Sequence, residues 1–186
     1  MIILSSDQEV VIMKRKINVW EYAPQILEAV GKGVLVTTKA DGVVDTMTIG
    51  WGTLGIEWGK PIFTVFVRES RYTKALLDKN PEFTINVPLG DCDKNIISVC
   101  GTKSGRDIDK FAELALTPEA PEVISVPGIR ELPLTLECKV IYRQQQTPQC
   151  VLDDHIYTHY EHPCPDIEQD YHTAYYGQIV SAYIIE

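Results

Sequence analysis

The chain has 186 residues, of which 45% are hydrophobic and 23% charged, as in an ordinary globular domain with a sizeable core. Its formal net charge of -9 argues against nucleic acid or an anionic membrane surface as a partner, because both attract basic patches. No apolar run approaches the roughly 20 residues of a membrane helix, and residues 1–16 lack a signal-peptide pattern. We expect residues 1–12 to be a disordered or variable extension and residues 13–186 to form a single domain.

In chain order, the sequence predicts six strands joined by hairpins, loops and short helices. The expected strands cover residues 34–38, 43–50, 61–67, 83–88, 134–142 and 173–185. The expected helices cover residues 20–30, 72–79, 91–100 and 107–116, with a short one around 152–160. The glycine-rich or proline-rich residues 51–60, 101–105 and 117–133 are expected to be loops. Since strand and helix do not alternate regularly, a closed or nearly closed antiparallel barrel is favoured over a doubly wound sheet.

Cysteine and histidine usage gives little sign of disulfides or metal. The five cysteines are an odd number at irregular spacing with no CxxC pair, which favours a reduced, cytoplasmic protein. All four histidines lie between residues 155 and 172. His155 and His159 are one helical turn apart, a spacing that metal ligands use, but prolines interrupt their segment and indicate an exposed loop. No metal site is therefore predicted.

Two segments concentrate groups that suit a flat, anionic ligand. They contain Thr46, Met47, Thr48, Ile49, Gly50 and Trp51 in the first, and Arg68, Ser70, Arg71, Tyr72 and Thr73 in the second. Guanidinium forks, hydroxyls and the N–H groups that open the following helix are suitable donors to a phosphate. The alternative is that the arginines form surface ion pairs with Glu69 and Asp78, beside a helix capped by Ser70.

A third polar segment and one histidine are further candidates. The segment includes Cys100, Ser104, Gly105 and Arg106, and it lacks the GxxxxGK[ST] spacing of a nucleotide-triphosphate loop. It is either a second polar loop near a ligand or the capped start of a helix. His172 immediately precedes the last strand, where a histidine acts in a ligand pocket or bonds to the backbone. Without a GxSxG elbow or a convincing Cys/His pair, nucleophilic catalysis is not predicted.

Taken in series, these segments resemble the flavin reductase-like, flavoredoxin-type proteins. The matching stretches are residues 44–51, 61–63, 68–73, 83–88, 100–106, 109–111 and 171–180, in the same order over residues 20–186. The resemblance implies a mainly β fold, a six-stranded antiparallel FMN-binding split barrel with short flanking helices. It implies a homodimer with FMN near the subunit interface. It also implies NAD(P)H-dependent flavin reduction, or electron transfer through FMN to a second flavin or a redox protein.

The resemblance also implies roles for the candidate residues. Residues 46–51 would hold the isoalloxazine ring, residues 68–73 the phosphate with help from 100–106, and His172 would face the nicotinamide or substrate. A flavin brings its own redox reactivity, which fits the missing nucleophile. Two alternatives remain open: oxidation of a small molecule, as in pyridoxamine-phosphate-oxidase-like barrels, and a non-enzymatic module that binds flavin or haem.

Overall fold

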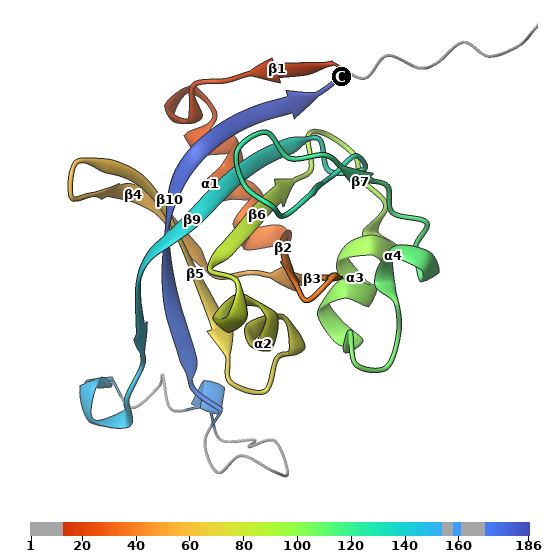
Figure 1. The fold of residues 1–186 in the computed structure, drawn as a ribbon. Coiled ribbons are helices and arrows are strands. Elements are labelled where there is room, and N and C mark those ends of the chain that lie inside the picture. The colour runs from red at the N-terminus through yellow and green to blue at the C-terminus, as the bar shows by residue number, and fades with distance from the viewer. Residues whose placement is uncertain (1–12, 154–157, 161–169) are drawn as a thin grey trace, which may run out of the picture.

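The computed structural model describes residues 13–153, 158–160 and 170–186 (Figure 1). Its main sheet is antiparallel, in the order β3-β2-β6-β9-β10-β5-β4, with β1 paired to β10 off this path. The strands are β1 (Lys14–Lys16), β2 (Val34–Ala40), β3 (Val43–Ile49), β4 (Gly52–Glu57), β5 (Lys60–Arg68), β6 (Glu82–Val87), β7 (Pro118–Glu119), β8 (Gly128–Ile129), β9 (Leu134–Gln145) and β10 (His172–Ile185). The helices are α1 (Ala23–Lys32), α2 (Tyr72–Lys79), α3 (Lys94–Thr102) and α4 (Lys110–Glu113). The extension expected for residues 1–12 lies outside the described residues.

The two end strands of this sheet, β3 and β4, are consecutive in the sequence and are separated only by Gly50 and Trp51. A sheet whose end strands are joined by so short a connection has to curl until its edges approach each other. No ladder closes the barrel there, because β3 pairs with β2 and β4 pairs with β5. The result is an antiparallel barrel that is split between β3 and β4. The sequence predicted a split antiparallel barrel but not the place of the split.

All six expected strands are present, but the loop expected over residues 51–60 was wrong. Residues Gly52–Glu57 form β4, which returns into β5 as a hairpin. Trp58 and Gly59 make its turn with φ values of 50° and 69°. Two positive φ values are typical of the mirror-image turns that match strand twist, but tryptophan is an unusual residue in the first position. The glycines therefore indicated a loop where the chain forms an edge strand.

Of the helix predictions, 72–79 matches α2, and those over 20–30 and 91–100 held with shifted ends. Pro24 in the first turn moves the start of α1 to Ala23, and Gly33 ends the helix with a φ of 112°. The helix expected over residues 107–116 is only the four-residue α4, because Ala115 turns into the left-handed region with a φ of 50°. Around residues 152–160, the structure has 3₁₀ turns at Pro148–Cys150 and Thr158–Tyr160, and residues 154–157 lie outside the described part.

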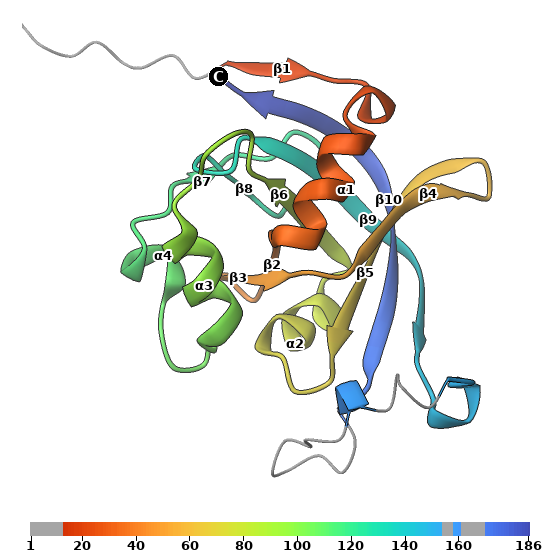
Figure 2. The same cartoon turned by 180° about the vertical axis from the view of Figure 1, so that it is seen from behind.

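Two apolar clusters surround strand β2, whose side chains are largely buried on both faces. Its Val34 and Val36 face the barrel core, which α1 covers by packing against β4 and β6 (Figure 2). Leu35 points the other way, into a smaller cluster with α3 and the proline-rich connector. That connector is not entirely loop, since β7 and β8 pair within it. Burial on both faces holds β2, and with it the neighbouring edge strand β3, firmly in place.

Gly177 gives the first testable prediction. A Cβ atom there would lie 2.4 Å from Phe83 Cζ and 2.8 Å from the Cβ of Cys138, in the packed barrel interior. We expect Gly177→Ala to lower the free energy of unfolding by about 1–3 kcal/mol, measured by urea denaturation. The matched control is Gly55→Ala in strand β4, where nothing lies within 4 Å of the added atom. A similar loss in both variants would contradict the packing argument.

Candidate functional site

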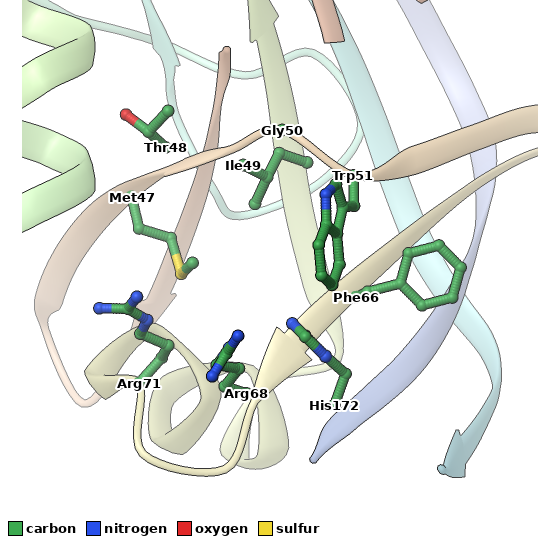
Figure 3. A pocket seen from close by; sticks show the side chains of 9 residues that line it. All are labelled: Met47, Thr48, Ile49, Gly50, Trp51, Phe66, Arg68, Arg71 and His172. Atoms are coloured by element: carbon green, nitrogen blue, oxygen red, sulfur yellow. The ribbon is translucent and has the colours of Figure 1, made fainter. Parts of the chain in front are cut away.

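A cavity of about 160 Å³ lies where the barrel is split (Figure 3). It is lined by Met47, Thr48, Ile49, Gly50, Trp51, Phe66, Arg68, Arg71 and His172. The structure thus brings together five residues of the first predicted segment, both arginines of the second segment and the predicted histidine. The β5–β10 ladder explains part of this meeting, because it places Arg68 directly opposite His172.

Phe66 is the one lining residue that sequence reasoning missed. It had been assigned to a strand buried on both faces, and its neighbours Val65 and Val67 are indeed fully buried. Alternation along a strand puts Phe66 on the opposite face from these two and on the same face as Arg68. That period of two was the signal in the sequence that could have found it.

Arg71 carries a guanidinium group without a hydrogen bond or ion pair to any residue that the structure describes. Glu69 and Asp78, the expected surface partners, instead pair with Lys74 at 3.0 and 2.7 Å. Arg71 is also the N-cap residue of α2, and no side chain caps the first turn of that helix. An uncapped helix N-terminus with an unpaired arginine is a favourable place for an anion.

Arg68 is the more constrained of the two arginines. It donates to the carbonyl of His159 at 2.9 Å and lies 3.9 Å from the carboxylate of Asp170. Both arginine side chains nevertheless extend from the β5–α2 turn toward the β3–β4 junction (Figure 3). The cavity therefore has one strongly basic wall, although the chain as a whole is acidic.

Several predicted side chains are directed away from the cavity. The hydroxyl of Ser70 donates to Asp170 at 2.7 Å instead of capping α2, and Thr73 donates to Asp45 at 2.6 Å. The hydroxyl of Thr46 donates to a β2 carbonyl at 3.2 Å, and that of Thr48 donates to the α3 carbonyl of Ile97 at 2.6 Å. Each of these hydroxyl protons is therefore already used within the protein.

The residues predicted from 100–106 lie close to the second segment without lining the cavity. Arg106 donates to the Ser70 carbonyl at 3.0 Å, and its guanidinium lies 5.3 Å from the ring centre of Tyr72. Ser104 accepts from the Arg106 N–H group at 3.1 Å. Cys100 is packed in the cluster under α3, where burial raises the pKa of its thiol to about 11. The thiol is therefore protonated at neutral pH.

His172 is buried beside the exposed ring of Trp51, with ring centres 5.0 Å apart. Burial, and then the charge of Arg68, lowers the pKa of His172 to about 4, so the ring is neutral at physiological pH. Its Nδ1 lies 3.0 Å from the Tyr160 hydroxyl, which itself donates to Gln146 at 3.1 Å. With the Tyr160 proton donated to Gln146, the hydroxyl oxygen suits the tautomer in which Nδ1 donates and Nε2 accepts. No sequence motif marked Tyr160 or Gln146.

The chain belongs to the flavin reductase like domain family. The model of that family matches residues 30–186, which cover most of the chain. This match confirms the resemblance drawn from the sequence.

The described residues contain no group of three His, Cys, Asp or Glu placed to hold a metal. Within the same residues, no helix is long and apolar enough to cross a membrane.

Solved structures of flavoredoxins and of an FMN-binding domain are similar in fold to this chain. A flavoredoxin from Methanosarcina acetivorans has a TM-score of 0.62 at 21% identity, over 99% of this chain and 75% of that one. An FMN-binding domain of a flavin reductases-like enzyme from Shewanella baltica OS155 has a TM-score of 0.64 at 15% identity, over 93% and 76%. The flavoredoxin of Desulfovibrio vulgaris (Miyazaki F) has a TM-score of 0.60 at 23% identity, over 82% and 68%.

A curated relative is closer in sequence but matches a shorter stretch. It is an uncharacterized protein from Archaeoglobus fulgidus, 31% identical over 97 residues. The aligned region is 52% of this chain and 54% of that protein. The match therefore spans about half of each chain, and it carries no activity from one to the other.

The low pKa of His172 gives a pH prediction. A histidine in the unfolded chain has a pKa near 6.5, whereas that of folded His172 is about 4. Between these values the unfolded state binds more protons, so stability falls as the pH drops from 6.5 to 4. The slope of the unfolding free energy against pH is proportional to the number of protons taken up on unfolding. In this window we expect His172→Asn to lower that number by about one. An NMR titration should find the imidazole pKa near 4, and a value of 6 or above would contradict the assignment.

Proposed function

We propose that this protein binds FMN in the cavity at the split and acts as an NAD(P)H-dependent flavin reductase or a flavoredoxin-like electron carrier. The observation that carries the proposal is Arg71 on the cavity wall, whose guanidinium has no partner among the described residues and which stands at a helix N-terminus that its side chain does not cap. Family membership supplies the flavin chemistry, and the FMN-binding and flavoredoxin structures with the same fold support the choice of FMN.

The phosphate end of FMN suits the basic wall. A phosphate dianion would receive charge-assisted hydrogen bonds from Arg71 and Arg68 and from the free N–H groups that open α2. Ser70, Thr73 and Cys100 use their side chains elsewhere, so this end depends on guanidinium and backbone donors. We propose that Tyr72, Ser104, Gly105 and Arg106 support this wall from outside the cavity.

The ring end would lie along residues 47–51. Gly50 and Trp51 occupy the break between the β2–β3 and β4–β5 ladders, so neither ladder takes up their backbone groups. These groups are suitable partners for the polar edge of an isoalloxazine, whereas the hydroxyls of Thr46 and Thr48 are committed to carbonyls. Trp51 and Phe66 add aromatic surface beside them. We propose that the backbone, and not the threonine hydroxyls, recognises the ring.

When bound, FMN supplies the hydride and one-electron chemistry, and the protein supplies binding, orientation and electrostatics. Neutral His172 adds no positive charge to the cavity, and its Nε2, which has no hydrogen-bond partner among the described residues, can accept a hydrogen bond or a proton from a reductant or substrate. Tyr160 holds the imidazole in the tautomer that leaves this nitrogen available. His172 is thus the residue proposed to act on the nicotinamide or substrate side.

The site would be completed by a second copy of the chain. The cavity is small and open compared with the ligand pockets of about 300–1,000 Å³ that enclose a cofactor. Large apolar side chains are exposed beside it at Trp51 and at Leu27 of α1, and elsewhere on the surface at Trp20 before α1 and at Ile56 and Trp58 of the β4–β5 hairpin. These features support a homodimer with FMN near the interface.

The four described cysteines are free, which fits the proposed cytoplasmic location.

The central test is a titration of the purified protein with FMN, followed by flavin absorbance and fluorescence. Binding with quenched fluorescence is expected, and a colourless protein that takes up no FMN would refute the proposal. Anaerobic stopped-flow mixing with NADH or NADPH then distinguishes the two roles. Rapid bleaching indicates a reductase, and reduction only by another protein indicates a carrier. Turnover of an amine substrate would instead favour the oxidase alternative.

Arg71→Ala tests the phosphate end. Hydrogen bonds to charged groups contribute about 1.5–3 kcal/mol, so we expect FMN to bind roughly 10- to 100-fold more weakly. Riboflavin lacks the phosphate, and its affinity should change less than about threefold. The control is Arg130→Ala, because Arg130 pairs with Glu119 away from the cavity. Equal weakening of FMN and riboflavin would rule out the phosphate assignment.

A further inference from the structure

A buried ion pair lies next to the cavity without lining it. Asp45 and Lys110 have exposed fractions of 3% and 4%, and their charged atoms lie 3.2 Å apart. Burying two charges costs free energy, and well-packed apolar residues often stabilise a fold equally well. Unlike an apolar contact, the pair has a defined geometry, because the carboxylate and the ammonium group each make further hydrogen bonds to specific atoms.

Those further bonds connect three separate elements. Lys110, at the start of α4, donates to the carbonyl of Thr46 in β3 at 2.6 Å. Asp45, also in β3, accepts from the hydroxyl of Thr73 in the first turn of α2 at 2.6 Å. In the part of the chain that the structure describes, this is the one side-chain hydrogen bond between β3 and α2. We call Asp45, Thr73 and Lys110 the buried triad.

The triad contacts the chain next to both walls of the cavity, the ring-side wall of residues 47–51 and the phosphate-side wall that carries Arg71. Thr46, whose carbonyl it binds, directly precedes residues 47–51 on the proposed ring side. Thr73 lies two residues after Arg71 on the proposed phosphate side. The distance between the two walls is therefore set by a short chain of buried polar contacts and not only by apolar packing.

The segment before Lys110 is shaped around the same carboxylate. A Cβ atom at Gly105 would lie 2.2 Å from Asp45 Oδ1 and 2.8 Å from Tyr72 Cδ1, so only glycine fits. The next residue, Arg106, reaches the carbonyl of Ser70 at 3.0 Å. Residues 105–110 thus contact both walls from behind, which gives this polar motif a role even though none of its side chains lines the cavity.

We propose that the buried triad consists of positioning residues that fix the spacing between the ring-side and phosphate-side walls. This inference rests on the proposed function. A fixed spacing benefits a ligand that engages both walls, because binding at one end raises the effective concentration at the other. FMN is such a ligand. Riboflavin engages only the ring side and inorganic phosphate only the basic side, so neither depends on the spacing.

The test measures dissociation constants for FMN, riboflavin and inorganic phosphate with the full chain and its variants. Lys110→Met should reduce the affinity advantage of FMN over riboflavin by tenfold or more, with riboflavin and phosphate each changed less than about threefold. Thr73→Val removes a single hydroxyl and keeps the ion pair, so it should fold normally and reduce the advantage by a smaller factor. The matched control is Glu119→Gln, which removes the charge of a buried carboxylate that pairs with Lys14 and Arg130 elsewhere.

The outcomes separate this inference from the function on which it rests. If the wild-type chain binds no flavin, the proposed function fails and the positioning role fails with it. If the wild-type chain prefers FMN but folded Lys110→Met and Thr73→Val variants keep the full preference, only the positioning role is refuted. A comparable loss of preference in Glu119→Gln would also refute it, since general destabilisation would then explain the effect. If Lys110→Met does not fold, Thr73→Val decides.

Discussion

The whole arrangement depends on the two-residue connection between β3 and β4. Because the end strands of the sheet are joined by Gly50 and Trp51 alone, the sheet has to curl, and because no ladder joins those strands, the curled sheet stays split. The split leaves the backbone of the connection outside both ladders and opens a cavity beside it. The opposite wall comes from β5 and β10, whose antiparallel register sets Arg68 against His172.

Charge is distributed to match this geometry. The chain carries a formal net charge of -9, yet the cavity wall holds two arginines and a neutral histidine. The nearby carboxylates of Glu69 and Asp78 are taken up by Lys74, which leaves Arg71 without a partner among the described residues. Behind the wall, Asp45 and Lys110 neutralise each other and spend their remaining bonds on the two sides of the cavity. The arginines of the cavity wall are thus available to a ligand, whereas the buried Asp45–Lys110 pair is proposed to position the two walls.

The candidate site was only partly predictable from the sequence. Arg71 and Arg68 line the cavity as candidates from the second segment, but Ser70 and Thr73, which looked equally suitable, bond to Asp170 and Asp45 from distant parts of the chain. A hydroxyl in a polar segment has the same local appearance whether it faces a ligand or a buried carboxylate. Phe66 was missed because a continuous apolar strand hides which of its faces is inside. The edge strand β4 was missed because Gly52, Gly55 and Gly59 gave residues 51–60 the composition of a loop.

The sequence by itself determined the fold class and the identity of most cavity-lining residues. β-branched runs and turn residues act locally, and hydrophobic periodicity reports which element a segment forms. The ordered series of motifs was enough to indicate the family. Only the tertiary structure decided which side chains point into the cavity, that His172 is neutral, and that Asp45, Thr73 and Lys110 meet. These properties depend on burial and on hydrogen bonds between residues far apart in the chain, which no local pattern records.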